Sequence, residues 1–208
     1  MTEPEVSARS LLVVTLLLGV LLFLVYGPAL RGGFVSDDLG YVVGNPWVHE
    51  LSLANVRAIL DPTGPAAAHT ANWAPLHLLL HAVDWQLFGP ETLGHHAVNV
   101  ALHAIASGLL VALFVRYGAP FVPAAIAGAL FALHPANVEA VAWIFQLKSI
   151  VALALATAAL LPEMLAFERL GQQREAEYDR PAQQGGRARA RRPRGGRHAA
   201  EDRDRRDR

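Results

Sequence analysis

The sequence predicts an all-α protein, a polytopic membrane bundle of about four spans. Hydrophobic residues make up 53% of its 208 residues and charged residues only 17%, whereas average globular chains carry about 25% charged residues. The first 165 residues also contain long stretches without Asp, Glu, Lys or Arg, and a spanning helix needs about 20 mostly apolar residues. The chain has no cysteine, which excludes thiol chemistry, disulfides and the common structural zinc sites.

Spans are predicted at about residues 11–29, 93–115, 119–134 and 149–167. The first has an apolar core from Leu11 to Tyr26. This core is longer than the ~7–15 residues expected of a cleaved signal peptide, and the leader before it carries two acidic residues and a single Arg9, so we favour an uncleaved anchor. With a cytoplasmic amino terminus, Arg9, Arg116 and the arginines that follow the last span share one side, which is the positive-inside arrangement.

Charge separates the membrane module, residues 1–170, from a tail over residues 171–208. Residues 1–165 hold five basic and ten acidic residues, whereas residues 166–208 hold thirteen and eight. The tail is rich in Gln, Gly and Arg and has no periodic apolar residues, so we expect it to be disordered. Its interleaved acids argue against binding of RNA or anionic lipid, and no nucleic-acid partner is expected. Its composition also fits out-of-frame translation of a GC-rich gene, the interpretation we favour.

An external loop over residues 30–92 joins the first two spans, and part of it has helical periodicity. The apolar positions at helical spacing are Leu76, Leu79, Leu80, Val83 and Leu87. His77, His81 and Asp84 lie on another face. We predict an amphipathic surface helix whose apolar face lies in the lipid boundary or against the bundle. The three polar residues could ligate a metal, but we prefer a polar stripe and assign no metal ligands.

The second span carries polar residues on one face, because His95, Asn99, His103 and Ser107 follow each other every four residues. Polar side chains at membrane depth normally face the bundle and form hydrogen bonds across helices, which is what we expect here. His95 and His96 lie at the external end, where they could reach a site.

Two acidic residues, Asp37 and Asp38, lie about ten residues beyond the first span. A carboxylate at the membrane surface is where a general base for a lipid-linked substrate has to sit. One member of such a pair tends to have a raised pKa because of its neighbour's charge, which suits a base.

A second candidate region leaves the third span at His134 and continues through Glu139 to Trp143. A charged side chain so near the bilayer is a functional hypothesis by default. The alternative is that this segment caps a helix and anchors it at the interface, with Trp143 in the aromatic belt.

Six segments, in order and spacing, resemble the amino-terminal half of bacterial membrane proteins that carry tetratricopeptide repeats. These proteins are related to the animal transmembrane O-mannosyltransferases, within the C-type glycosyltransferase superfamily. The resemblance covers roughly residues 12–168. The segments are Gly33-Phe34-Val35-Ser36-Asp37-Asp38, Asn45-Pro46, Asn72-Trp73-Ala74-Pro75-Leu76, Leu87-Phe88-Gly89, residues 94–103, and residues 129–143.

The resemblance implies an integral membrane protein of the bacterial inner membrane, and the distribution of arginines indicates that both termini are cytoplasmic. It would transfer a sugar, with mannose as one candidate, from a polyprenyl-phosphate donor to a protein hydroxyl with inversion. Asp37 or Asp38 would be the base, and Lys148 and His134 would stabilise the leaving phosphate. The remaining residues that the resemblance implies for donor binding are Glu139, His95 and His96. The expected partners are lipid, donor and protein acceptor; no cofactor is expected, and the need for a divalent metal stays open.

Three departures from the family support an alternative. Relatives usually have Glu-Arg-Lys-Asp where this chain has Gln146-Leu147-Lys148-Ser149, and a lone lysine lacks the bidentate fork of arginine. Relatives also often have His or Arg at the position of Ala74, and their later spans and repeats are missing here. The alternative function is therefore a non-catalytic membrane anchor or assembly module, or an inactive truncated fragment.

Overall fold

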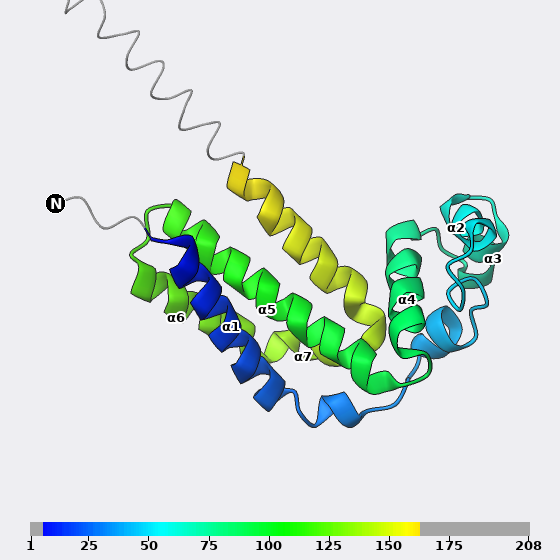
Figure 1. The fold of residues 1–208 in the computed structure, drawn as a ribbon, viewed down its shortest axis with the longest axis horizontal. Coiled ribbons are helices and arrows are strands. Elements are labelled where there is room, and N and C mark those ends of the chain that lie inside the picture. Colours follow the sequence, from blue (N-terminus) through cyan, green and yellow to red (C-terminus); the bar gives the residue numbers. More distant parts are fainter. Residues whose placement is uncertain (1–5, 163–208) are drawn as a thin grey trace, which may run out of the picture. The chain divides into compact units, whose positions relative to one another are not determined.

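The computed structural model describes residues 6–162, and the regular structure of these residues is entirely helical, as predicted (Figure 1). The predicted tail and the end of the fourth predicted span lie outside the described residues. In chain order the elements are α1 (Ala8–Val25), η1 (Ala29–Arg31), η2 (Leu39–Val43), α2 (Leu53–Leu60), α3 (Pro65–Thr70), α4 (Pro75–Phe88), α5 (Thr92–Arg116), α6 (Phe121–Ala132), η3 (Pro135–Asn137), α7 (Val138–Ala142), η4 (Ile144–Gln146) and a last helix over residues 147–162.

Three helical segments are long and apolar enough to cross a membrane: α1, α5 and Ile144–Pro162. They correspond to the first, second and fourth predicted spans. α1 begins where Ser7 accepts a hydrogen bond from the backbone N–H of Ser10, the usual role of a serine at a helix start. The chain is therefore a membrane protein with three such helices among the described residues, or four if the bent pair described next counts as one span.

The third predicted span differs from the expected single helix. α6 has 12 residues, a length of about 18 Å, whereas the hydrocarbon core is about 30 Å thick. The chain then bends by 50° and continues as Pro135–Ala142. Pro135 has no N–H to continue the helix of α6, and the ring Nδ1 of His134 accepts the N–H of Ala136 at 3.2 Å to start the next turn. The two pieces form a broken span or a re-entrant loop.

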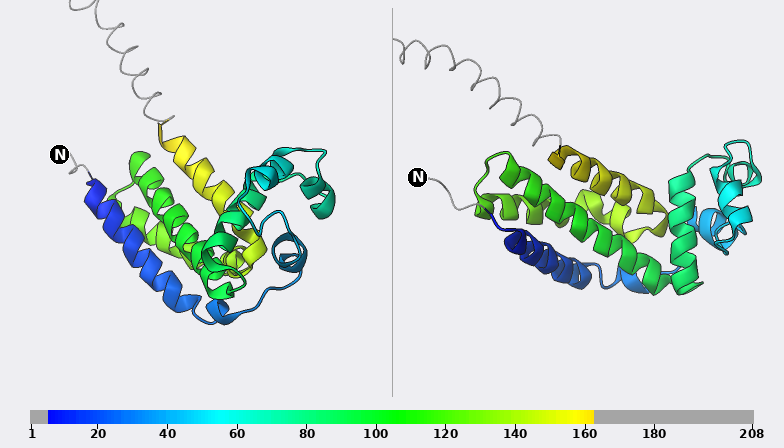
Figure 2. Two further views of the ribbon diagram at one scale, coloured as in Figure 1. Left: turned by 45° about the vertical axis from the view of Figure 1, so that its right-hand side comes forward. Right: turned by 45° about the horizontal axis from the view of Figure 1, so that its top comes forward.

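Small residues allow α1 and α5 to pack closely, side by side (Figure 2). A Cβ atom added to Gly108 would overlap the side chain of Thr15, and one added to Gly19 would lie 3.7 Å from the Cβ of Ala104. In lipid, close backbone approach at small residues drives helix association because the hydrophobic effect does not. This contact holds the first span against the helix that carries the polar face.

We expect Gly108→Val to destabilise the protein because the added side chain has to displace Thr15 or separate the two helices. Overpacking of this kind costs about 1–3 kcal/mol. Thermal unfolding in detergent, followed by circular dichroism, measures the effect. Gly40→Ala is the control, because a Cβ at Gly40 meets no atom within 4 Å; equal melting temperatures for all three proteins would contradict the packing.

The polar face of α5 lies inside the bundle, as predicted, with all four residues at most 2% exposed. Asn99 Nδ2 donates to the carbonyl oxygen of Trp143 at 2.9 Å. His103 Nε2 donates to the carbonyl oxygen of Ala132 at 3.1 Å. These bonds join α5 to two places where neighbouring helices end, so they fix the positions of the chain segments that lead into the candidate site.

The predicted external loop is more ordered than a loop with one helix, because it builds a small apolar core of its own. Tyr41 and Trp47 pack on this core. Its buried members are Val48, Ile59, Ala66, Leu78 and Ala82. They come from four stretches of the loop, so the core holds α2, α3 and α4 together.

The predicted amphipathic helix exists as α4, but its polar face is the buried one. His77, His81 and Asp84 are at most 6% exposed, whereas Leu76 and Leu87 are 52% and 67% exposed. The interpretation of the three polar residues as a stripe on the outside of the helix was therefore wrong. The physical reason is that α4 packs against α5 and the 143–148 segment, whose backbone and side chains offer polar partners, while exposed leucines are well tolerated at a lipid boundary.

Candidate functional site

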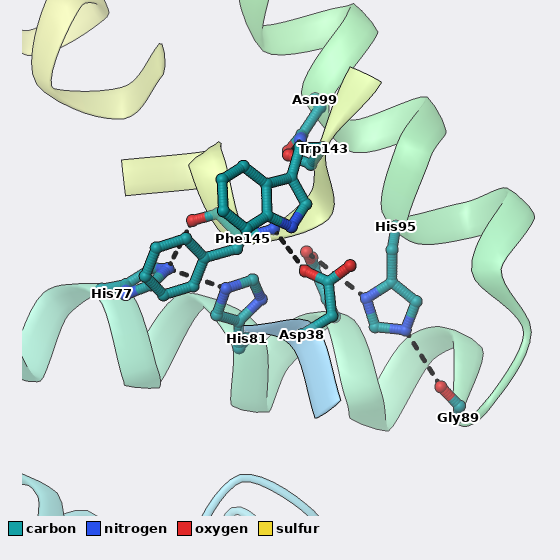
Figure 3. A network of polar contacts seen from close by, with 9 residues as sticks. Asp38, His77, His81, Gly89, His95, Asn99, Trp143 and Phe145 are labelled. Atoms are coloured by element: carbon teal, nitrogen blue, oxygen red, sulfur yellow. Dashed lines mark hydrogen bonds and ion pairs between the residues drawn. The ribbon is translucent and has the colours of Figure 1, made fainter. Parts of the chain in front are cut away.

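Four chain segments meet around a buried polar network (Figure 3). They are the loop before η2, helix α4, the first turns of α5 and the segment of η4. We use the term polar network for the side chains of Asp38, His77, His81, Asp84 and His95 together with the backbone of Phe145. The network includes Asp38, one member of the acidic pair that the sequence singled out.

Asp38 ties the first loop to the segment that follows α7. Its side chain is 1% exposed, and its Oδ1 accepts the N–H of Phe145 at 2.8 Å across 107 residues of sequence. Its Oδ2 accepts the N–H of Val35 at 2.9 Å. Burial raises the pKa of Asp38; the two backbone hydrogen bonds and the nearby His96 oppose this rise, and the charge of Asp37 adds to it. The raised pKa expected for one member of the pair is present, with burial as its main cause.

Asp37 is exposed, unlike its neighbour. Lys148 lies within electrostatic range of this carboxylate, and its Nζ sits 3.5 Å from the centre of the Phe145 ring. An ammonium over an aromatic face is held by a cation–π attraction. The structure therefore brings the acidic pair, Asp37 and Asp38, close to Phe145 and Lys148, which lie more than 100 residues later in the sequence.

His77 and His81 form a pair inside α4. Their Nε2 atoms are 2.8 Å apart, and His77 Nε2 also lies 3.0 Å from the carbonyl oxygen of Phe145. Burial lowers the pKa of His77 to about 4, assisted by the charge of Lys148 and opposed by the Phe145 carbonyl. Burial also holds the pKa of His81 well below its usual range. Both rings are therefore neutral at physiological pH.

Asp84 and His95 face each other between α4 and α5. Asp84 Oδ2 is 4.0 Å from His95 Nδ1, and burial raises the pKa of Asp84 to about 7. His95 is held from its other side by the carbonyl oxygen of Gly89 at 3.0 Å and by edge contacts with the rings of Phe34 and Phe88.

His96 points to the chain between α1 and the acidic pair. Its Nε2 lies 3.3 Å from the carbonyl oxygen of Gly32, and a Cβ on Gly32 would approach that nitrogen to 3.4 Å. A glycine at this position lets the backbone come close to the ring. Both histidines at the start of α5 therefore support the loop that carries Asp37 and Asp38.

His134 and Glu139 have other contacts than the acidic pair in the described part of the chain. His134 is exposed and caps η3. Glu139 Oε1 accepts from Gln146 Nε2 at 3.3 Å, and Gln146 Oε1 accepts from Ser149 Oγ at 2.6 Å. These contacts fit the capping alternative for His134 and make Glu139 a brace of the turn that precedes Lys148.

Sequence reasoning missed the backbone of Phe145 and the inward position of His77, His81 and Asp84. A backbone N–H leaves no trace in a sequence pattern, so its bond to Asp38 was not accessible. For α4, the sequence did contain a signal that this face is buried: a histidine pair at i, i+4 followed by an aspartate. Three such residues cost more free energy to leave in lipid than leucines do.

Comparison with known proteins finds relatives among the protein O-mannosyl-transferases. Protein O-mannosyl-transferase Tmtc1 of Drosophila melanogaster is 38% identical over 127 residues, which are 59% of this chain and 15% of that protein. Protein O-mannosyl-transferase TMTC1 of Homo sapiens is 32% identical over 138 residues, 62% of this chain and 15% of that protein. Protein O-mannosyl-transferase F38B6.6 of Caenorhabditis elegans is 28% identical over 151 residues, 67% of this chain and 21% of that protein.

The chain is thus distantly homologous to part of these proteins, and it spans about a seventh to a fifth of their length. No family model and no solved structure matches it.

Proposed function

We propose, from this distant homology, that the chain is the part of a membrane glycosyltransferase that carries both the donor site and the catalytic base. It transfers a sugar, with mannose as the first candidate, from a polyprenyl-phosphate donor to a protein hydroxyl with inversion. The observation that carries the proposal is the grouping of an exposed carboxylate, Asp37, with a cation, Lys148, beside the bridge between Asp38 and Phe145. Attack by a hydroxyl on a sugar phosphate needs a base on one side and charge stabilisation on the other.

Asp37 fits the role of the base better than Asp38. Both oxygens of Asp38 already accept backbone N–H groups, and its side chain is buried, so an acceptor hydroxyl cannot reach it without breaking that bridge. Asp37 is exposed and lies on the same turn. We therefore assign the proton transfer to Asp37 and the positioning of its loop to Asp38.

Lys148 is assigned to the leaving phosphate. The ring of Phe145 lies under its ammonium group and Asp37 lies within electrostatic range, so the cation is held near the proposed base. Glu139 braces the preceding turn through Gln146. His134 caps η3 on the same connection between α6 and the last helix. His95 supports the acidic loop through the ring of Phe34, and His96 does so through the carbonyl oxygen of Gly32.

The lipid part of the donor has a candidate path along the first span. An apolar groove of about 680 Å³ runs between α1 and α5. Its lining includes Thr15, Gly19, Phe23, Leu30, Ala101 and Ile105. Leu30, which also lines the groove, lies two residues before Gly32, whose carbonyl oxygen contacts His96. An isoprenoid chain lying there would bring its phosphate toward the acidic loop.

The proposed orientation has Arg9 and Arg116 on the cytoplasmic side of a bacterial inner membrane, with both termini cytoplasmic.

A transfer assay tests the proposal. The purified chain in lipid nanodiscs is given radiolabelled polyprenyl-phosphate mannose and a peptide rich in Ser and Thr. We expect label in the peptide, with the anomeric configuration inverted. Absence of label in the peptide, with the donor bound, would overturn the transferase assignment.

A second candidate function is a non-catalytic membrane module that binds the donor or assembles with other chains. The observation that favours it is the position of Leu147, which is 1% exposed. A buried leucine stands where the resembling family has an arginine, so Lys148 has no cationic neighbour there to grip a phosphate in bidentate fashion. Donor binding without transfer in the same assay is the result expected of this second function.

A further inference from the structure

Two buried histidines and a buried carboxylate meet where α4 packs on α5. His81, Asp84 and His95 each offer one ligand atom, and these three atoms all lie within 4.8 Å of one another. The three residues are at most 6% exposed. Figure 3 shows His81 on α4 and His95 on the neighbouring helix α5, both within the polar network.

The tautomer of His95 is set by the backbone. Its Nε2 lies 3.0 Å from the carbonyl oxygen of Gly89, and since a carbonyl only accepts, Nε2 carries the hydrogen. Nδ1 is then the nitrogen with the free lone pair. It has no hydrogen-bond partner among the described residues and faces Asp84 Oδ2 at 4.0 Å, beyond hydrogen-bonding range. Two electron-pair donors thus face each other across a buried gap.

His81 contributes a third nitrogen. Its Nε2 contacts His77 Nε2 at 2.8 Å, which leaves Nδ1 buried and without a partner among the described residues. Because His77 Nε2 donates its hydrogen to the carbonyl oxygen of Phe145, His81 Nε2 accepts in the metal-free protein and Nδ1 carries the hydrogen. Metal binding at Nδ1 therefore requires the hydrogens of both rings to move to their other nitrogens. Metal-ligating histidines nearly always form a hydrogen bond through their other ring nitrogen, which fixes the orientation of the ring. His95 has such a bond with Gly89, and His81 gains one to His77 once its hydrogen lies on Nε2.

We propose that His81, Asp84 and His95 bind one divalent transition-metal ion, with zinc as the metal that fits best. Zinc takes histidine nitrogen and carboxylate oxygen at about 2.0–2.2 Å, so ligand atoms in a tetrahedral site lie about 3.4 Å apart. From separations of 4.0 Å to at most 4.8 Å, each side chain has to move by about 1 Å or less to reach this geometry. Three protein ligands leave a fourth position for water.

The site differs from the grouping visible in the sequence. The sequence grouped three residues of one helix, His77, His81 and Asp84. In the structure, however, His77 contacts the backbone of Phe145 and the ring of His81. His95 from α5 is therefore the third ligand in place of His77. The ion would link α4 to α5 and so hold the external loop, residues 30–92, against the helices of the bundle. Metal binding does not require the proposed transferase activity, so the two proposals can fail separately.

Cobalt binding tests the site directly. The full chain in detergent is stripped with a chelator and titrated with Co²⁺, and the visible absorption of tetrahedral cobalt is recorded. We expect one equivalent of Co²⁺ to bind and Zn²⁺ to displace it. Zn²⁺ should also raise the melting temperature of the stripped protein, because a ligand that binds the native state stabilises it. A wild-type protein that gives neither signal would overturn the proposal.

Variants locate the site. Asp84→Asn and His95→Gln should weaken metal binding by at least about 100-fold. Loss of a hydrogen-bond partner of a ligand usually lowers metal affinity by about 10- to 100-fold, and loss of a ligand itself should lower it further. His103→Gln is the matched control, because His103 is a buried histidine on the same helix that contacts Ala132 instead. Unchanged affinity in both ligand variants would place the metal elsewhere and refute the assignment. If either variant fails to fold by circular dichroism, the wild-type titration alone decides.

Discussion

Asp37→Asn is expected to lower sugar transfer by about 10²- to 10⁴-fold, the usual contribution of a positioned general base. The amide has nearly the shape of the carboxylate but cannot take a proton from the acceptor hydroxyl. Because Asp37 is exposed, the substitution should leave folding unchanged. Donor binding should therefore persist while the transfer rate falls.

The measurement is the initial rate of label transfer in nanodiscs, together with the melting temperature of each variant. Glu50→Gln is the control, since Glu50 is another exposed acid of the same external segment. A rate for Asp37→Asn equal to that of the control would remove Asp37 from the mechanism. A loss of rate accompanied by a lower melting temperature would point to a structural role instead.

Asp38→Ala is expected to destabilise the protein by about 2–4 kcal/mol, because hydrogen bonds to a charged group contribute about 1.5–3 kcal/mol each and part of this is offset by the cost of burying the carboxylate. The substitution leaves the N–H groups of Val35 and Phe145 without their acceptor. The loop before η2 then loses its hydrogen bond to the η4 segment, so the distance between Lys148 and Asp37 is no longer fixed.

Thermal or denaturant unfolding in detergent measures this effect. Asp61→Ala is a close control, because Asp61 also accepts two hydrogen bonds, from the backbone and side chain of Thr63, but does so at an exposed position. We expect a much smaller loss for the control. Equal losses for Asp38→Ala and Asp61→Ala would show that burial of the Asp38 bridge adds nothing to stability.

The helices could be predicted from the sequence because their signals are local. A charge-free apolar stretch long enough to cross the bilayer marks α1, and four polar residues at a spacing of four mark the inward face of α5. The acidic pair was also found from its position after the first span. The different roles proposed for the two residues could not be predicted, because Asp37 and Asp38 are the same residue type and differ only in burial.

The course of the third predicted span could be predicted only in part from the local sequence. The apolar stretch around α6 predicted one helix, and Pro135 marked its end. The sequence thus marks the break at Pro135, but it does not give the 50° angle between the two pieces, which only the structure shows.

The sequence by itself determined that this is a membrane protein, where most of its helices run and which acidic residues are candidates for a site. It could do so because hydropathy and periodicity are properties of neighbouring residues. Only the tertiary structure decided that the polar face of α4 turns inward, that Asp38 bonds to Phe145 and that His95 joins His81 and Asp84. Each of these depends on segments distant in sequence. Polar groups sheltered from water must find partners wherever the fold places them, and those partners cannot be read from a local pattern.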